Sequence, residues 1–121
     1  MNVLEEIKEI ISEVLDIEKG EIAEESYLIR ELDAESVDFL EMALSFSEVF
    51  GFEVQDDFIF LRNFQEYMAE AEENGLNINS LLCKKYEFLS SYRVDEMLSD
   101  IKSGNIIKIK DLVSYINFYK K

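Results

Sequence analysis

One serine in the stretch LDAESVDFLEMAL is the residue of this 121-residue chain that is best placed to do chemistry. Ser36 stands where an irregular segment gives way to helical periodicity, and four acidic residues surround it: Asp33, Glu35, Asp38 and Glu41. A serine at a helix start can be an N-cap, whose hydroxyl accepts a backbone N–H two or three residues further on. The same position suits a covalently attached phosphodiester, because unpaired N–H groups and the helix dipole favour an anion there. The local sequence leaves both roles open.

The residue types exclude most catalytic sites. The chain has no histidine, so it lacks a Ser–His pair and histidine metal ligands. No glycine-rich phosphate-binding loop is present, and Asp56 and Asp57 lack the spacing of an EF-hand loop. Cys83 is the only cysteine, and with no histidine to activate it we expect a small buried hydrophobic residue. We therefore predict that the chain is not an enzyme.

The acidic charge is concentrated in one half of the chain. Residues 1–60 carry 18 acids and 3 bases, whereas residues 61–121 carry nine of each, so the net charge of −15 lies entirely in the first half. Such a field repels nucleic acid and anionic membranes and attracts basic protein surfaces. No segment approaches the roughly 18 apolar residues of a membrane span, and the acidic N-terminus is not a secretory signal. We predict a cytoplasmic protein that neither binds nucleic acid nor inserts into membranes.

The apolar spacing predicts an all-α fold, in a chain with no proline and only four glycines. An amphipathic helix capped by Asn2 is expected over residues 3–15, and a second from Ser36 to about Phe50. Further helices are expected in four segments: 58–74, 77–89 (capped by Asn77 or Asn79), 94–103 and 107–121. Residues 17–35 read as a long loop. The stretch NIIKI reads as a loop that anchors Ile107 and Ile109 in the core, rather than as a strand.

The helix that begins at Ser36 carries apolar and acidic residues on different faces. One face is traced by Val37, Leu40, Ala43, Leu44, Ser47 and Phe50 or Val49. Another carries mainly Asp38, Glu41, Ser45 and Glu48. Acids in the first turns complement the positive end of the helix dipole.

Residues 1 to about 57 resemble the acyl carrier protein family. That family's attachment motif reads roughly Asp-Ser-Leu-Asp after a leucine, a glycine and a small residue, and LDAESVDFLE stands at the same register. Before it, ESYLIREL is similar to the family's loop, and after it, FSEVFGFEVQDD is similar to its acidic helix end. Near the C-terminus, IIKIKDLVSYI is similar to the closing helix, with matches at Asp111, Leu112, Val113, Tyr115 and Ile116.

The resemblance implies a carrier whose Ser36 holds 4′-phosphopantetheine, attached by a phosphopantetheinyl transferase. Acyl groups would ride on its thiol as thioesters, for fatty acid or specialised lipid or secondary-metabolite synthesis. Basic surfaces of the acyl-loading and acyl-transferring enzymes would dock on four acids: Glu35, Asp38, Glu41 and Glu48. We expect this docking to use exposed charges rather than a large apolar patch, and the carrier to be a monomer. Two alternatives stay open: an aminoacyl or peptidyl carrier, and an unmodified acidic binding module in which Ser36 is only a cap.

The chain also departs from the family pattern. Asp33 replaces the usual glycine, Glu35 replaces the aspartate before the serine, and Val37 replaces leucine. The largest departure is residues 58–105, where a typical member has one short helix. We therefore predict one carrier domain: an acyl-carrier-protein-like helical bundle formed by residues 1–57 and 106–121, with about three extra helices inserted before the C-terminal one. The insertion either enlarges the core alone or enlarges an apolar chamber for a large acyl chain.

Overall fold

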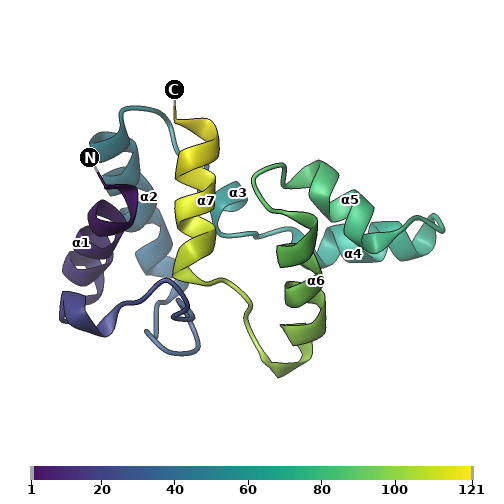
Figure 1. The fold of residues 1–121 in the computed structure, drawn as a ribbon, viewed down its shortest axis with the longest axis horizontal. Helices are drawn as coiled ribbons and strands as arrows, with labels where there is room; N and C mark the ends of the chain where they lie inside the picture. The colour runs from purple at the N-terminus through teal and green to yellow at the C-terminus, as the bar shows by residue number, and fades with distance from the viewer. Residues whose placement is uncertain (1, 121) are drawn as a thin grey trace.

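The computed structural model describes residues 2–120, and within that range it has seven α-helices and no β-strand (Figure 1). The helices are α1 (Val3–Leu15), α2 (Ser36–Phe50), α3 (Asp56–Ile59), α4 (Phe64–Glu73), α5 (Ile78–Lys85), α6 (Ser91–Asp100) and α7 (Ile109–Tyr119). Two 3₁₀ turns, η1 (Lys19–Glu21) and η2 (Ile101–Ser103), lie in the connections. The prediction of an all-α fold is confirmed.

The helices form two groups joined through the short α3 (Figure 1). Helix α1 packs against α2 and α7 in one group, while α4 packs against α5 and α5 against α6 in the other. The long loop before α2 meets the segment before α7, where Tyr27 and Lys108 form a β-bridge and the Leu28 N–H donates to Ile107 O at 3.0 Å. None of the helices described for residues 2–120 has both the length and the apolar character to cross a membrane.

The first two helices have the predicted bounds, but the buried face of α2 differs from the predicted apolar face. Asn2 caps α1 as predicted, since its Oδ1 accepts the Glu5 N–H at 3.2 Å. In α2 the buried residues are Met42, Ala43, Phe46 and Phe50. Val37, Leu40 and Leu44 are 75, 59 and 65% exposed, so part of the predicted face lies on the surface, whereas Ala43 and Phe50 of that face are buried. Because α2 is apolar on more than one side, periodicity alone does not select the side that meets α1.

The prediction of one continuous helix over residues 58–74 is wrong. Helix α3 ends at Ile59, and Leu61 adopts a left-handed conformation with φ of 55°. The Leu61 N–H donates to Phe58 O at 3.1 Å and the Arg62 N–H to Asp57 O at 2.9 Å, a helix-ending pattern that usually contains glycine. Left-handed backbone costs a leucine about 1–2 kcal/mol, which burial of its side chain in the core offsets.

The later helices agree with the sequence more closely. Asn77 caps α5, because its Oδ1 accepts the Ser80 N–H at 2.9 Å. Helix α5 ends at Lys85, earlier than predicted, and α6 begins three residues earlier than predicted, with Ser90 as its cap. Cys83 is half-buried rather than fully buried, and burial raises the pKa of its thiol, which disfavours the reactive thiolate.

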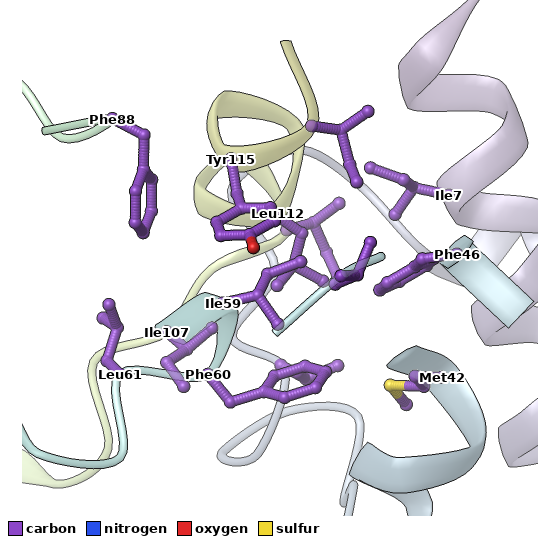
Figure 2. Packing of buried hydrophobic residues seen from close by; sticks show 14 of the residues in the cluster. Ile7, Met42, Phe46, Ile59, Phe60, Leu61, Phe88, Ile107, Leu112 and Tyr115 are labelled. Atoms are coloured by element: carbon purple, nitrogen blue, oxygen red, sulfur yellow. The ribbon is translucent and has the colours of Figure 1, made fainter. Parts of the chain in front are cut away.

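One continuous apolar core joins the two groups of helices (Figure 2). Ile107 and Ile109 are buried in it as predicted, although only Ile107 lies in the loop and Ile109 is the first residue of α7. Around the buried Tyr86 lies a cluster of aromatic rings at centroid distances of 5.6–6.1 Å: Phe58, Phe64, Tyr67 and Phe88. The Phe88 ring also meets Tyr115 of α7 at 5.1 Å. Aromatic contacts therefore continue from α3 to α7 through the second group of helices.

A buried ion pair joins α6 to α7. Arg93 is 7% exposed and Asp111 is 1% exposed. The guanidinium donates from Nε to Asp111 Oδ1 at 2.8 Å and from Nη2 to Oδ2 at 2.7 Å. Nη2 also donates to Ile106 O at 2.9 Å, and Asp111 Oδ2 accepts the Lys108 N–H at 2.9 Å. The two charges are thus paired with fork geometry and further hydrogen bonds, as burial requires.

Candidate functional site

Ser36 is the first residue of α2 and is not its cap. Glu35 occupies the N-cap position, and its N–H donates to Asp38 Oδ2 at 2.8 Å. The Ser36 side chain is exposed, and its hydroxyl forms no hydrogen bond within the part of the chain that the structure describes. The interpretation of Ser36 as a cap is therefore wrong. Glu35 and Asp38 together form a capping box, in which Asp38 supplies the bond to the N-cap N–H, and this leaves the serine hydroxyl accessible at the helix start.

The turn before α2 explains how an aspartate replaces glycine at position 33. Asp33 has φ of 58°, in the left-handed region that glycine adopts without strain. The Asp33 N–H donates to Ile29 O at 3.1 Å and the Ala34 N–H to Leu28 O at 3.2 Å. Aspartate is among the few other residues that adopt this conformation regularly. The departure at Asp33 thus keeps the backbone course that leads into Ser36.

The exposed side of α2 mixes acidic with apolar side chains. Three of the predicted docking acids are exposed: Glu35, Glu41 and Glu48. The fourth, Asp38, is half-buried and holds the Glu35 N–H. Between them lie the exposed Val37, Leu40 and Leu44, so the expectation of a surface of charges alone is incomplete. We call these three apolar residues with Glu41 and Glu48 the α2 surface. The sequence could have indicated this exposed apolar strip, because α2 carries apolar residues on two sides and only one side can pack against the core.

An acidic groove lies beside the start of α2. It has a volume of about 560 Å³, and four apolar residues contribute to its lining: Val14, Leu15, Ile17 and Leu32. Five carboxylates line it: Glu21, Glu31, Asp33, Glu35 and Asp38. Their charges add to the field of the α2 surface, which attracts basic partners. Within the described residues, no group of three or more His, Cys, Asp or Glu side chains is placed to hold a metal ion.

A second groove, of about 550 Å³, has Ser36 in its wall. Its lining comes from three segments: Ser36 and Phe39 of α2; Phe60, Leu61, Arg62, Phe64 and Gln65 around the start of α4; and Ile101, Gly104, Asn105, Ile106 and Ile107 before α7. Most of these side chains are apolar. The rings of Phe39 and Phe60 stack with centroids 4.3 Å apart and planes 11° apart. We call this the Ser36 groove. The sequence did not predict it, because its three segments are distant along the chain.

The family model described as "Phosphopantetheine attachment site" matches residues 5–67, a range that contains Ser36. The acyl carrier protein of Buchnera aphidicola subsp. Baizongia pistaciae is 32% identical over 89 residues, which span 72% of this chain and 97% of that protein. The acyl carrier protein of Coprothermobacter proteolyticus is 38% identical over 55 residues, 46% of this chain and 67% of that protein. The acyl carrier protein of Picosynechococcus sp. is 36% identical over 55 residues, with shares of 46% and 68%. No solved structure gives a significant match.

Proposed function

The chain belongs to the phosphopantetheine attachment site family, with distant homology to acyl carrier proteins, and from that premise we propose that it is an acyl carrier protein modified on Ser36. Domains of this family carry 4′-phosphopantetheine, are modified by phosphopantetheinyl transferases and are generally not catalysts. The observation that carries the proposal is the exposed Ser36 hydroxyl, which has no hydrogen-bond partner among residues 2–120 and lies inside the matched range.

The residues around Ser36 fit a phosphodiester on its Oγ. Position N1 of α2 places the phosphate beside backbone N–H groups and the positive end of the helix dipole, both of which favour an anion. Glu35 and Asp38 oppose that anion, but one oxygen of the Asp38 carboxylate is engaged by the Glu35 N–H. The cofactor supplies a thiol on which acyl groups are held as thioesters. The chain itself anchors and presents the arm for fatty acid, specialised lipid or secondary-metabolite synthesis.

Partner enzymes dock, in this proposal, on the acids Glu35, Asp38, Glu41 and Glu48 together with the apolar residues of the α2 surface. The acids raise the association rate with basic enzymes. The exposure of Val37, Leu40 and Leu44 supports an apolar contact at the centre of the docked interface. Such a small apolar strip within a charged rim suits contacts that form and release during successive transfers.

The same proposal divides the chain into a carrier-like core and an insertion. Residues 1–57 and 106–121 form the carrier-like core, and residues 58–105 are an insertion within one domain. Two observations support this assignment. Helices α4, α5 and α6 lie together on one side of the molecule (Figure 1), and they share an apolar core with α7 rather than forming a separate one.

Intact mass spectrometry tests the attachment. Incubation with coenzyme A and a broad-range phosphopantetheinyl transferase should add the mass of one phosphopantetheine group to the wild type. Ser36→Ala should fold normally, because the hydroxyl is exposed and bonds to none of the residues that the structure describes, and it should gain no mass. No gain on the wild type would show an unmodified binding module, and an equal gain on Ser36→Ala would place the attachment elsewhere. Loading the modified form with acyl or aminoacyl groups by purified loading enzymes then separates the two carrier types.

Charge reversal tests the docking surface. The pair Glu41→Lys and Glu48→Lys should slow modification by about tenfold at low salt and by less at high salt, because exposed charges act through a screened field. Both side chains are exposed, so the fold should be unaffected. Glu72→Lys with Glu73→Lys makes the same change in net charge at exposed positions of α4. Equal slowing by both pairs would show that net charge acts without a docking site on α2.

A further inference from the structure

A network of side chains joins the end of α6 to the turn that precedes α2. The Tyr27 hydroxyl donates to Asp100 Oδ2 at 2.5 Å, across 73 residues of chain. Arg30 Nη2 lies 3.2 Å from the same oxygen and donates to the Asp100 carbonyl at 3.2 Å. We call these contacts the Asp100 network. We propose that Asp100 is a positioning residue for the modification of Ser36, because this network holds the turn that presents the serine hydroxyl.

The turn runs over residues 27–34 and leads directly into the start of α2, and we call it the Ser36 turn. The Ala34 N–H donates to Leu28 O at 3.2 Å, which closes the turn on itself two residues before Ser36. Leu28 is buried in the core, which fixes the inner side of the turn. The outer side is fixed by the Asp100 network. A displacement of the turn therefore reaches the serine through only two residues of chain.

Arg30 is enclosed on several sides. Its guanidinium carbon lies 4.1 Å from the centre of the Tyr27 ring. Its Nε is buried and has no hydrogen-bond partner among the described residues. Gly104, with φ of 139°, lies so close that a Cβ there would be 2.9 Å from Nε. The Arg30 and Asp100 side chains are 23 and 24% exposed, so salt screens their ion pair less than it screens a fully exposed pair.

The place of Asp100 on its helix indicates what its carboxylate stabilises. Asp100 is the last residue of α6, where the negative end of the helix dipole disfavours a carboxylate. The last turn of α6 contains no basic residue that would offset this effect. The hydrogen bonds from Tyr27 and then Arg30 lower the pKa of Asp100, so the carboxylate is ionised at neutral pH. Its favourable contacts are therefore with the Ser36 turn rather than with its own helix.

The inference rests on the proposed attachment at Ser36 and adds a residue from outside the matched range. The family model covers residues 5–67, which include Tyr27 and Arg30, whereas Asp100 lies well beyond them. A partner enzyme would therefore find the serine at a position that depends on a helix from the insertion.

The step that depends on this position is the transfer of phosphopantetheine. Ser36 Oγ bonds to the phosphorus that carries the pantetheine group, and its proton passes to a base of the transferase. The pyrophosphate bond of coenzyme A breaks, and the nucleotide part leaves with the electron pair. The rate of such a step can fall about a hundredfold when a reacting atom is displaced by about 1 Å. Loss of the Asp100 network should therefore slow the transfer, while the acids of α2 still dock.

Steady-state kinetics test the inference, with a broad-range phosphopantetheinyl transferase, coenzyme A in excess and the carrier as the varied substrate. Asp100→Ala should lower kcat about tenfold, because the serine is less often in place for transfer. KM should change by less than about twofold, because the docking acids are unaltered. Tyr27→Phe removes one hydrogen bond and should lower kcat about threefold. Adding it to Asp100→Ala should have no further effect, because the hydroxyl then has no partner to lose.

Asp95→Ala is the matched control, since it removes an aspartate from the same helix. Asp95 Oδ1 accepts a hydrogen bond from Asn79 Nδ2 at 2.7 Å, so its carboxylate holds α5 rather than the Ser36 turn. The control should therefore keep the wild-type kcat.

Hydrogen exchange on the unmodified proteins shows whether the turn itself moves. A hydrogen bond to a charged group changes an equilibrium by about tenfold. Amides of residues 28–36 should therefore exchange about tenfold faster in Asp100→Ala than in the wild type, whereas Asp95→Ala should leave them unchanged. Amides of α1 should exchange at wild-type rates in both variants, because the opening is local.

A kcat that is unchanged in Asp100→Ala, or that falls equally in Asp95→Ala, would overturn the inference and leave the attachment intact. A change confined to KM would do the same, because it would show an effect on docking. Wild-type exchange of residues 28–36 in Asp100→Ala would also overturn it, since the turn would then not depend on the network. If the wild type gains no mass from the transferase, the attachment itself is wrong, and this inference with it.

Discussion

Removing the carboxylate of Asp111 should be among the most damaging single changes in this protein. In Asp111→Ala the Arg93 guanidinium keeps its buried position, with 7% of the residue exposed, but loses its buried counter-ion and keeps only the more exposed Glu96 carboxylate, 3.6 Å from Nη1. Two hydrogen bonds from Arg93, at 2.8 and 2.7 Å, disappear, as does the one from the Lys108 N–H at 2.9 Å. The perturbation thus combines a buried charge that has lost its hydrogen-bonded counter-ion with the loss of a helix-start interaction for α7.

The expected loss in the free energy of unfolding is about 3–5 kcal/mol, the usual result of breaking a buried ion pair from one side. For a chain of this size, 1 kcal/mol corresponds to about 4 °C in Tm, so the midpoint should fall by about 12–20 °C. Small domains are stable by only about 5–15 kcal/mol, so the variant should be marginal. Because the pair joins α6 to α7, amides of α6 should lose exchange protection first.

Urea unfolding followed by circular dichroism measures the loss, with the midpoint and slope fitted separately. The double variant Arg93→Met with Asp111→Leu is the control, since it removes both charges and keeps apolar volume. It should recover at least half of the lost stability, because no charge is left buried and the groups that lose a hydrogen bond from the pair are the uncharged Ile106 carbonyl and Lys108 N–H. A loss below about 1 kcal/mol for Asp111→Ala would refute the reasoning. So would a double variant as unstable as the single one.

Two further predictions concern the surface. Asp33→Gly should raise the free energy of unfolding by about 0.5–1 kcal/mol in urea titrations, because glycine adopts φ of 58° without strain; a loss would show that the aspartate side chain is stabilising. Hydrogen bonds from Lys108 and then Lys110 lower the pKa of Glu25 from 4.5 to about 2. A carboxyl group with a lowered folded-state pKa stabilises the protein above its unfolded pKa, and this contribution is lost as the pH falls from 4.5 through about 2. Because the Glu25 side chain is 64% exposed, the wild type should exceed Glu25→Gln by less than about 1 kcal/mol at pH 7, and the two should converge near pH 2; a constant difference would contradict this.

The sequence by itself determined the elements whose causes are local. The spacing of Ile7, Ile10 and Ile11 and the cap at Asn2 define α1, because both act within one or two helical turns. The bounds of α2, the capping of α5 and the burial of Ile107 and Ile109 were predicted on the same basis. The family was also readable from the sequence, because the motif around Ser36 and its flanks are contiguous stretches of chain.

Where the local sequence allows more than one arrangement, only the tertiary structure decided which arrangement forms. Both sides of α2 are apolar, and contact with α1 rather than periodicity buries Phe46 and exposes Leu44. Leu61 ends the helix although the apolar spacing continues past it. Its left-handed backbone conformation is strained, and burial of its side chain offsets that strain, which local sequence rules do not predict. Arg93 and Asp111 meet across 18 residues of chain, and the Ser36 groove assembles three distant segments. Each of these outcomes depends on contacts between residues far apart in the sequence, and such contacts form only when the helices pack.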